Sequence, residues 1–392
     1  MVAIGGETMK ARYACLAGVL LALDCGSSAA HELAVDFILG GDSNPNRLAD
    51  VFEVDTEAYT LGRVRFRHES AGTGFHYQID GRNDLYTRDD EGVTNAANAE
   101  EIRLSVIGGF TWAPALAHGP ANFTADIFYR RRDAIFVDRI TGGVATFSGT
   151  MIDNRFDAEE AGFQLSGDVP LSAAANFLFS LRSFDKKYES YVELGLANLD
   201  YQQTRVNLGF EKQMGARTRV RTIIGTGTRR YVDRRAREED GVLLADSDLE
   251  FTLFGVTGML DIQLGDRWNW QVGAEVDQRK DNESGYYDLT EASAFSQLRY
   301  RNEHFVNFLF TAAYLNRELD NIDDNAIMTL EEEEKEKDGY RIGTELVRNV
   351  TDWLNYDVDL ILGLNYESFG HDNLFYNYDR SQFYIGARWR AY

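Results

Sequence analysis

The segment from residue 355 to residue 369 most constrains the fold, because apolar and polar side chains alternate along it with a period of two. One face carries Tyr356, Val358, Leu360, Leu362, Leu364 and Tyr366, and the other carries Asn355, Asp357, Asp359, Gly363, Asn365 and Glu367. Ile361 is the exception. This period indicates a β-strand with two different faces. Tyr356 and Tyr366 would lie roughly 24 Å apart along a membrane normal if the strand is tilted by ~40–45°, which is about the height of a lipid-facing apolar band.

The same alternation recurs along the chain and predicts an all-β fold. The expected strands are 34–42, 56–68, 73–86, 100–112, 121–135, 155–168, 173–185, 201–212, 217–231, 249–263, 267–279, 291–301, 304–317, 339–349, 355–369 and 379–391. That is about 16 strands, an even number, as in single-chain bacterial barrels. A hairpin hidden in 136–154 or 186–200 would make 18.

The connections between these strands alternate in length. Short turns are expected near Ala71, Pro114 to Pro120, Pro170, Met214 to Ala216, Gly265-Asp266, Asn302-Glu303 and Val350 to Asp352, and long charged loops near residues 50, 90, 142, 189, 235, 283, 333 and 373. All four prolines would then lie between strands, since proline cannot donate to a β-ladder. The rhythm predicts a transmembrane antiparallel up-and-down β-barrel with short periplasmic turns and long extracellular loops. A soluble sandwich would show the same alternation, with its apolar face toward a core.

The first thirty residues have the features of a secretory signal. Lys10 and Arg12 precede the apolar stretch 14–23, and small residues lead to an expected cleavage before His31. We therefore predict a signal peptide at 1–30 and an outer-membrane β-barrel at 31–392. The predicted location is the outer membrane of a Gram-negative bacterium, in contact with lipid and lipopolysaccharide.

Composition argues against several other classes of function. The formal net charge is −23, which disfavours a nucleic-acid partner. Cys15 and Cys25 both lie within the predicted signal, so the mature chain has no thiolate nucleophile, disulfide or thiolate metal site. The six histidines come with no serine or paired acids at a catalytic spacing. We expect no enzyme, no cofactor and no metal site. The acidic run 330–338 is expected to be a solvated outer loop, or else a site that collects divalent cations or contacts lipopolysaccharide.

The polar strand faces predict a charged lumen. The expected pore-lining residues are Arg63, Arg65, Arg67, Arg103, Arg130, Arg132, Arg217, Arg219, Arg221, Glu275, Asp277, Asp357, Asp359 and Glu367. One interpretation is a basic wall that faces an acidic wall, which would create a transverse field that orients polar solutes. The other is that the inward charges pair locally with neighbours and hydrate the interior.

Two further features concern what could pass through the lumen. The inward aromatic residues Tyr59, Phe128, Phe251, Phe295 and Phe305 would either stack on a sliding sugar polymer or contact a plug. The segment 136–154 is the expected constriction loop, because its glycines allow a tight fold.

The end of the first expected strand, Gly40 to Arg47, reads Gly-Gly-Asp-Ser-Asn-Pro-Asn-Arg. It resembles a Gly-x-Asp-Ser-Asn stretch in a family of outer-membrane β-barrel porins, some of which are linked to exopolysaccharide secretion. The final segment 383–392 resembles the assembly signal of such barrels, although Tyr392 is offset by one from the apolar face. The resemblance implies a channel that assists polysaccharide export together with a periplasmic export protein. The alternatives are a small-solute diffusion porin and a closed structural or adhesive barrel.

Overall fold

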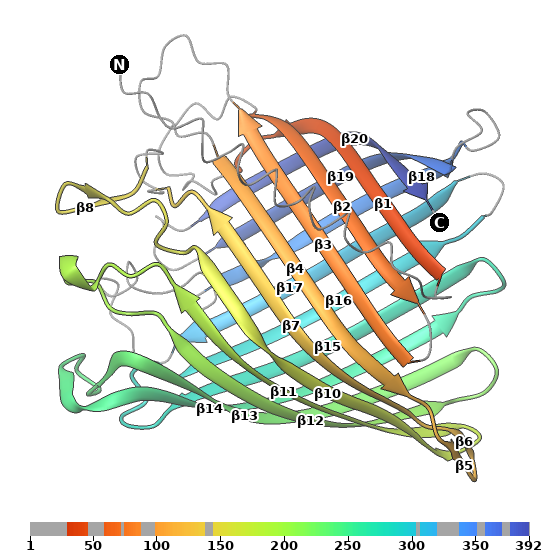
Figure 1. Cartoon of the computed structure of the whole chain (residues 1–392), viewed down its shortest axis with the longest axis horizontal. Helices are drawn as coiled ribbons and strands as arrows, with labels where there is room; N and C mark the ends of the chain where they lie inside the picture. The colour runs from red at the N-terminus through yellow and green to blue at the C-terminus, as the bar shows by residue number, and fades with distance from the viewer. Residues whose placement is uncertain are drawn as a thin grey trace.

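The computed structural model describes residues 30–45, 59–71, 74–87, 99–137, 144–302, 306–319, 337–350, 357–370 and 377–391. Sixteen of the strands in these ranges form one closed barrel in which each strand runs antiparallel to its neighbours (Figure 1). They are β1 (Ala30–Asp42), β2 (Tyr59–Ala71), β3 (Gly74–Thr87), β4 (Ala99–Trp112), β7 (Asn122–Ala134), β10 (Ala158–Ser172), β11 (Ala175–Tyr188), β12 (Tyr201–Gln213), β13 (Thr218–Arg237), β14 (Leu243–Gln263), β15 (Trp268–Asp281), β16 (Leu289–Tyr300), β17 (Asn307–Leu319), β18 (Lys337–Asn349), β19 (Asp357–Gly370) and β20 (Tyr378–Ala391).

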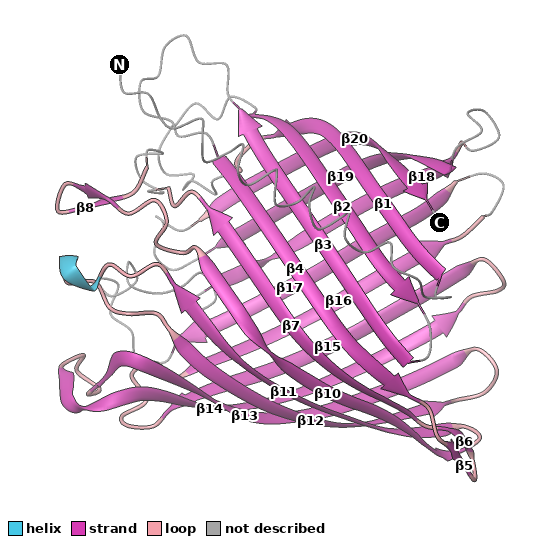
Figure 2. Cartoon of the chain, viewed as in Figure 1, coloured by secondary structure: helices cyan, strands magenta, loops and turns pink. Residues whose placement is uncertain are grey.

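The barrel closes between its first and last strands. β1 pairs with β20 over ten residue pairs, from Leu33 opposite Ala391 to Asp42 opposite Gln382. The remaining elements lie in the connections: the hairpins β5 (Ala115–Leu116) with β6 (Gly119–Pro120) and β8 (Thr146–Phe147) with β9 (Thr150–Met151), and the short helix η1 (Val192–Leu194) (Figure 2). None of the described residues belongs to a helix long and apolar enough to cross a membrane.

Burial along the strands is the reverse of that in a soluble sandwich. In β1, Phe37 and Leu39 are 58% and 65% exposed, whereas Asp36 between Val35 and Phe37 is only 5% exposed. In β19, Leu360, Leu362 and Leu364 are exposed and Asp359 is buried. Apolar side chains therefore point away from the barrel and charged ones point into it, as a lipid-spanning barrel requires. The predicted fold class and the predicted orientation of the two faces are confirmed.

The longest connections between barrel strands share one end of the barrel, and the shortest turns lie mostly at the other. Residues 72–73, 173–174, 214–217 and 264–267 connect strands at one end, and the segments 43–58, 88–98, 135–157 and 320–336 connect strands at the other. We call these the short-turn end and the long-loop end. In outer-membrane barrels they face the periplasm and the outside, respectively.

The structure corrects three details of the expected strand map. Pro170 lies inside β10, and the turn follows at residues 173–174. β13 and β14 continue to Arg237 and from Leu243, where a loop was expected. The segment 136–154 contributes the hairpin β8–β9, which lies beyond the strand ends at the long-loop end (Figure 1). In its described residues, the prediction of an inward constriction loop is therefore wrong.

Neither 136–154 nor 186–200 adds a barrel strand within the described residues, so 16 strands rather than 18 form the wall. Several predictions fall outside the described residues: the signal peptide up to residue 29, the acidic run up to residue 336, Phe305 and Tyr392.

Candidate functional site in the barrel lumen

The inner face of the wall is identified by side chains that cross from one strand to a strand that is not its neighbour. Arg205 on β12 donates from Nη2 to Asp277 Oδ1 on β15, at 2.5 Å, across β13 and β14. Its path crosses Gly225 and Gly255, and a methyl group at Gly255 would overlap Arg205 Nη2 and Asp277 Oδ1. A side chain can span several strands in this way only along the concave side of a barrel.

The pairing registers place the predicted pore-lining residues on this same inner face. The inward set comprises Arg63, Arg65 and Arg67 on β2, Arg103 on β4, Arg130 and Arg132 on β7, Arg219 and Arg221 on β13, Glu275 and Asp277 on β15, and Asp357, Asp359 and Glu367 on β19. Arg217 differs from the rest, because it lies in the turn before β13 and is exposed.

Apart from Glu275 and from Asp277, which pairs with Arg205 across two strands, the inward charges pair with nearby partners on the same or adjacent strands. Arg63 Nε lies 2.6 Å from Asp84 Oδ1, and Arg65 Nη2 lies 2.6 Å from Asp80 Oδ2. The other pairs are Arg67 with Glu69, Arg103 and Arg132 with Glu101, Arg130 with Glu160, Arg219 and Arg221 with Glu211, Arg341 with Glu367, and Arg390 with Asp357 and Asp359. The interpretation of a basic wall facing an acidic wall is therefore wrong, and the local-pairing interpretation describes the lumen.

The wall where β20 meets β1 holds an ion pair that is as deeply buried as the Arg63–Asp84 pair. Arg380 donates from Nη2 and Nε to Asp42, at 2.5 Å and 3.0 Å, and the Asp42 side chain is fully buried. Arg380 also contacts Glu367 Oε1 at 3.4 Å and Tyr86 Oη at 3.2 Å. We call Asp42, Tyr86, Glu367 and Arg380 the seam network. It joins β19, β20, β1 and β3, so it connects both ends of the chain.

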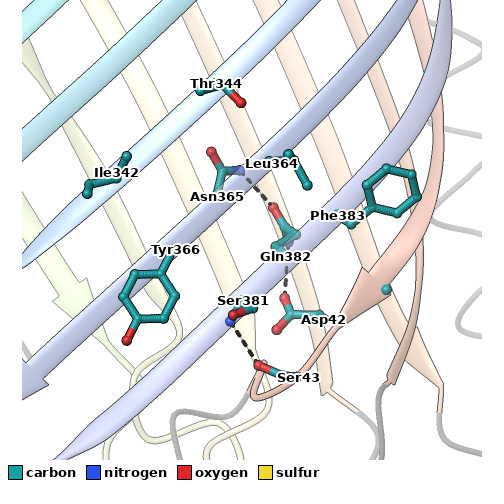
Figure 3. A pocket seen from close by; sticks show the side chains of 11 residues that line it. Asp42, Ser43, Ile342, Thr344, Leu364, Asn365, Tyr366, Ser381, Gln382 and Phe383 are labelled. Carbon is teal, nitrogen blue, oxygen red and sulfur yellow. Dashed lines mark hydrogen bonds between the residues drawn. The ribbon is translucent and has the colours of Figure 1, made fainter.

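Figure 3 shows the same seam together with a cavity in the wall. Asn365 Nδ2 donates to Gln382 Oε1 at 3.2 Å, and Gln382 Nε2 donates to Asp42 Oδ2 at 3.0 Å. The cavity measures about 480 Å³, and its lining includes the outward-facing Leu364 and Phe383. This cavity therefore opens on the lipid side of the wall.

A second cavity, of about 320 Å³, lies on the inner face of β11 to β15, and we call it the lumen recess. Its lining is Arg182, Phe184, Gln203, Arg205, Asn207, Ile223, Gly225, Gly255, Thr257 and Glu275. All of these positions share the inward register of their strands. Glycines on two neighbouring strands leave the space that side chains would otherwise fill. Of the lining residues, only Glu275 belongs to the predicted set.

Polar groups surround the recess. Arg182 is directly opposite Arg205 in the β11–β12 register and pairs with Glu160 on β10. Gln203 accepts a hydrogen bond from Arg229 at 2.9 Å, and Asn207 donates to Ser180 at 3.0 Å. The recess is therefore lined by guanidinium, amide, hydroxyl and carboxyl groups together with the ring of Phe184.

A row of aromatic rings lies next to the recess, on the long-loop side of Arg182 and Arg205. It consists of Phe128, Phe184, Tyr201, Tyr231 and Phe251, with neighbouring ring centroids 5.4 to 6.4 Å apart. All five are buried, and the Arg182 guanidinium lies 4.8 Å from the ring centres of both Phe128 and Phe184. These rings form a small core rather than a surface on which a sugar polymer could slide.

The closed wall, the outward apolar belt and the charged inner face occur together in one known architecture. The chain is a membrane-spanning β-barrel of the outer-membrane type.

No family model and no curated protein sequence matches the barrel. Solved structures of outer-membrane proteins are similar to it. Acinetobacter baumannii OccAB3 gives a TM-score of 0.44 at 9% identity, over 93% of this chain and 100% of that one. Pseudomonas aeruginosa OpdK with vanillate gives 0.43 at 10% identity, over 93% and 98%. A bacterial polysaccharide outer-membrane secretin gives 0.43 at 10% identity, over 93% and 99%. The fold is assigned from the closed order of the strands and from the apolar side chains on their outer faces.

Proposed function

We propose that the barrel is a passive diffusion channel for small polar solutes. The observation that carries this proposal is the lumen recess, a polar cavity of about 320 Å³ on the inner face of a membrane-spanning wall. Cavities that hold small molecules start at about this size. The locally paired charges around it keep the lumen hydrated without a large net field.

Export of a polysaccharide with a periplasmic partner stays a prediction from the sequence resemblance. A sugar polymer would need ring faces that are open to the lumen. Of the predicted inward rings, Tyr59, Phe128 and Phe251 are instead between 3% and 7% exposed, and Phe295 is half-buried. This burial is why we favour small solutes over a sliding polymer.

Thiol modification in planar bilayers tests the channel directly, because a chain that begins at residue 31 contains no cysteine. Thr257→Cys introduces a thiol on the inner face, in the recess, and Val256→Cys introduces one on the outer face, at the adjacent position. We expect stepwise single-channel currents that fall when a charged, water-soluble thiol reagent is added to Thr257→Cys.

The matched Val256→Cys channel should keep its current under the same treatment, since its thiol faces lipid. A barrel that inserts but carries no current would contradict the proposal and favour a closed structural role. Equal current loss in both variants would mean that the two faces of β14 are misassigned.

A further inference from the structure

Most charged side chains of the lumen have an ion-pair partner, but positive and negative charges are not equal in number on the two sides of the lumen recess. On the side formed by β7 to β11, Arg130 and Arg182 share the single carboxylate of Glu160. On the β15 side, Glu275 and Asp277 have only Arg205, and that guanidinium is bonded to Asp277. Among the described residues, no lysine or arginine lies within ion-pair distance of Glu275, whose carboxyl hydrogen-bonds to that of Asp277. The recess therefore has one basic end and one acidic end.

Hydrogen bonding also leaves this site incomplete. The Nε atoms of Arg182 and Arg205 are buried and have no hydrogen-bond acceptor among the described residues. Buried polar groups in proteins nearly always have a partner, so two such donors at the edge of one cavity need an explanation. A guanidinium binds a carboxylate through parallel N–H donors, and small rotations of either side chain would present Nε to a bound anion.

The floor of the recess explains why the two ends lie close together. Because Gly225 and Gly255 carry no side chain, Arg205 lies flat over β13 and β14 and brings its guanidinium to β15. Glu275 is two residues from Asp277 on that strand, so its carboxyl faces the same cavity. The acidic and basic groups thus converge on one small volume, as a ligand with two adjacent opposite charges requires.

We infer that the lumen recess binds a small zwitterion of the α-amino acid type. This inference rests on the proposed channel function and names the solute class that the channel favours. The ligand carboxylate contacts the Arg182 and Arg205 side, together with the amide of Asn207. The ligand ammonium group contacts Glu275, with the hydroxyl of Thr257 beside it. A solute with a single charge forms an ion pair at only one end of the recess and makes no ion pair at the other.

Three probes of equal chain length test the inference in planar bilayers: 2-aminopentanoate as the zwitterion, pentanoate as the anion and 2-aminopentane as the cation. The measurement is the concentration of each probe that halves the single-channel current. We expect the zwitterion to act at a concentration about tenfold lower than either single-charge probe, since one additional ion pair in a partly buried site is worth about that factor.

Two variants separate the ends of the recess. Glu275→Gln keeps the shape of the side chain and should weaken block by 2-aminopentanoate about tenfold while leaving pentanoate unchanged. Arg182→Gln should weaken block by both. The matched control is Asp168→Asn, which removes one inward carboxylate outside the recess and should change neither.

Binding of 2-aminopentanoate to the detergent-solubilised barrel, measured by calorimetry, keeps the inference separate from the channel proposal. Binding that Glu275→Gln weakens would support the zwitterion site even if the barrel carries no current. A conducting barrel that shows equal block by all three probes, or binding insensitive to Glu275→Gln, would overturn the inference and leave the channel standing.

Discussion

The seam network and the lumen recess are two parts of one inner wall, and they use the same kinds of side chain in opposite ways. At the seam, Asp42 is buried and accepts from both Arg380 and Gln382. At the recess, Glu275 forms no direct ion pair with a described lysine or arginine and shares the nearby Arg205 with Asp277, and two arginines each keep an unaccepted buried N–H. Charge at the seam is satisfied within the protein, whereas charge at the recess remains available to a solute.

Glycine placement accounts for much of this difference. At the seam, Gly363 leaves space for Tyr384, whose hydroxyl donates to Glu345 at 3.1 Å, so a large ring fills the gap. At the recess, Gly225 and Gly255 are crossed by the thin guanidinium of Arg205 and by the ends of the short side chains of Asn207 and Asp277. A filled gap stiffens the wall, and a gap left partly open forms a cavity. The same residue type therefore serves closure in one region and binding in the other.

The largest expected effect is at the seam. Arg380→Ala would leave the buried Asp42 carboxylate without its cation, and breaking a buried pair costs ~3–5 kcal/mol. The free energy of unfolding, measured in guanidinium chloride with the barrel in detergent micelles, should fall by about that amount. Arg103→Ala is the matched control, because its pair with Glu101 is half-exposed and should be worth under ~1 kcal/mol.

Equal losses in Arg380→Ala and Arg103→Ala would remove the distinction between the seam and the rest of the wall. If Arg380→Ala does not fold, Arg380→Lys provides the test, since it keeps the charge and should restore assembly.

The outer face of β19, the strand next to β20, predicts the next effect. Leu362→Arg places a charge opposite lipid, near the middle of the outer face of β19, where Leu362 is exposed. It should cost ~2–4 kcal/mol in the unfolding experiment, as cations near the bilayer midplane do. Leu362→Phe should leave stability nearly unchanged. A neutral result for Leu362→Arg would mean that this part of the wall does not contact lipid.

A glycine substitution at the recess should have a smaller effect on stability and a larger one on binding. Gly255→Ala displaces the Arg205–Asp277 pair, and overpacking of this kind costs ~1–3 kcal/mol. Gly258→Ala on the same strand meets nothing within 4 Å and should be neutral. Single-channel block by 2-aminopentanoate should weaken only in Gly255→Ala. If 2-aminopentanoate blocks Gly255→Ala as well as the unmodified channel, the space left by Gly255 does not determine binding in the recess.

The strands and their inward faces could be predicted from the sequence because period-two alternation survives along most of the wall. The predicted strand ends were wrong where a proline or a run of charged residues indicated a turn or loop instead of a strand. Pro170 was interpreted as a turn residue, yet β10 pairs with β7 only as far as Asp168, so its missing N–H interrupts no ladder on that side. The arginine-rich end of β13 beyond residue 231 was interpreted as a loop, although Arg234 and Ala236 are buried there.

The two sites could be predicted only in part, because alternation gives the face of a residue and not its height in the wall. Glu367 and Glu275 lie at inward register positions of β19 and β15, but their surroundings depend on the register between strands. Arg380 has the same parity as Arg388 and Arg390 in β20, and this signal could have revealed it. Nothing local indicates that Arg205 reaches Asp277, since that contact requires two glycines on the intervening strands.

The smallest predicted effect lies outside the membrane-spanning wall, at Asp157 before β10. Burial, with help from the charges of Asp133 and Asp153, raises the pKa of Asp157 to about 6, although its carboxyl accepts from the Ala134 N–H at 2.8 Å. A carboxyl whose pKa is raised on folding favours the folded loop at low pH and loses that contribution as pH rises through about 6.

Hydrogen exchange of residues 144–157, corrected for the intrinsic rate, should therefore be slower at pH 5 than at pH 7.5. The difference should be at most about tenfold, since solvent screens a half-buried group. Asp157→Asn should remove the pH dependence, and Asp153→Asn should only reduce it. The inner-wall segment of the seam should show no change over this range. A pH response of the same size in Asp157→Asn would place the titrating group elsewhere, and a response in β20 would mean that the long-loop end and the seam open together.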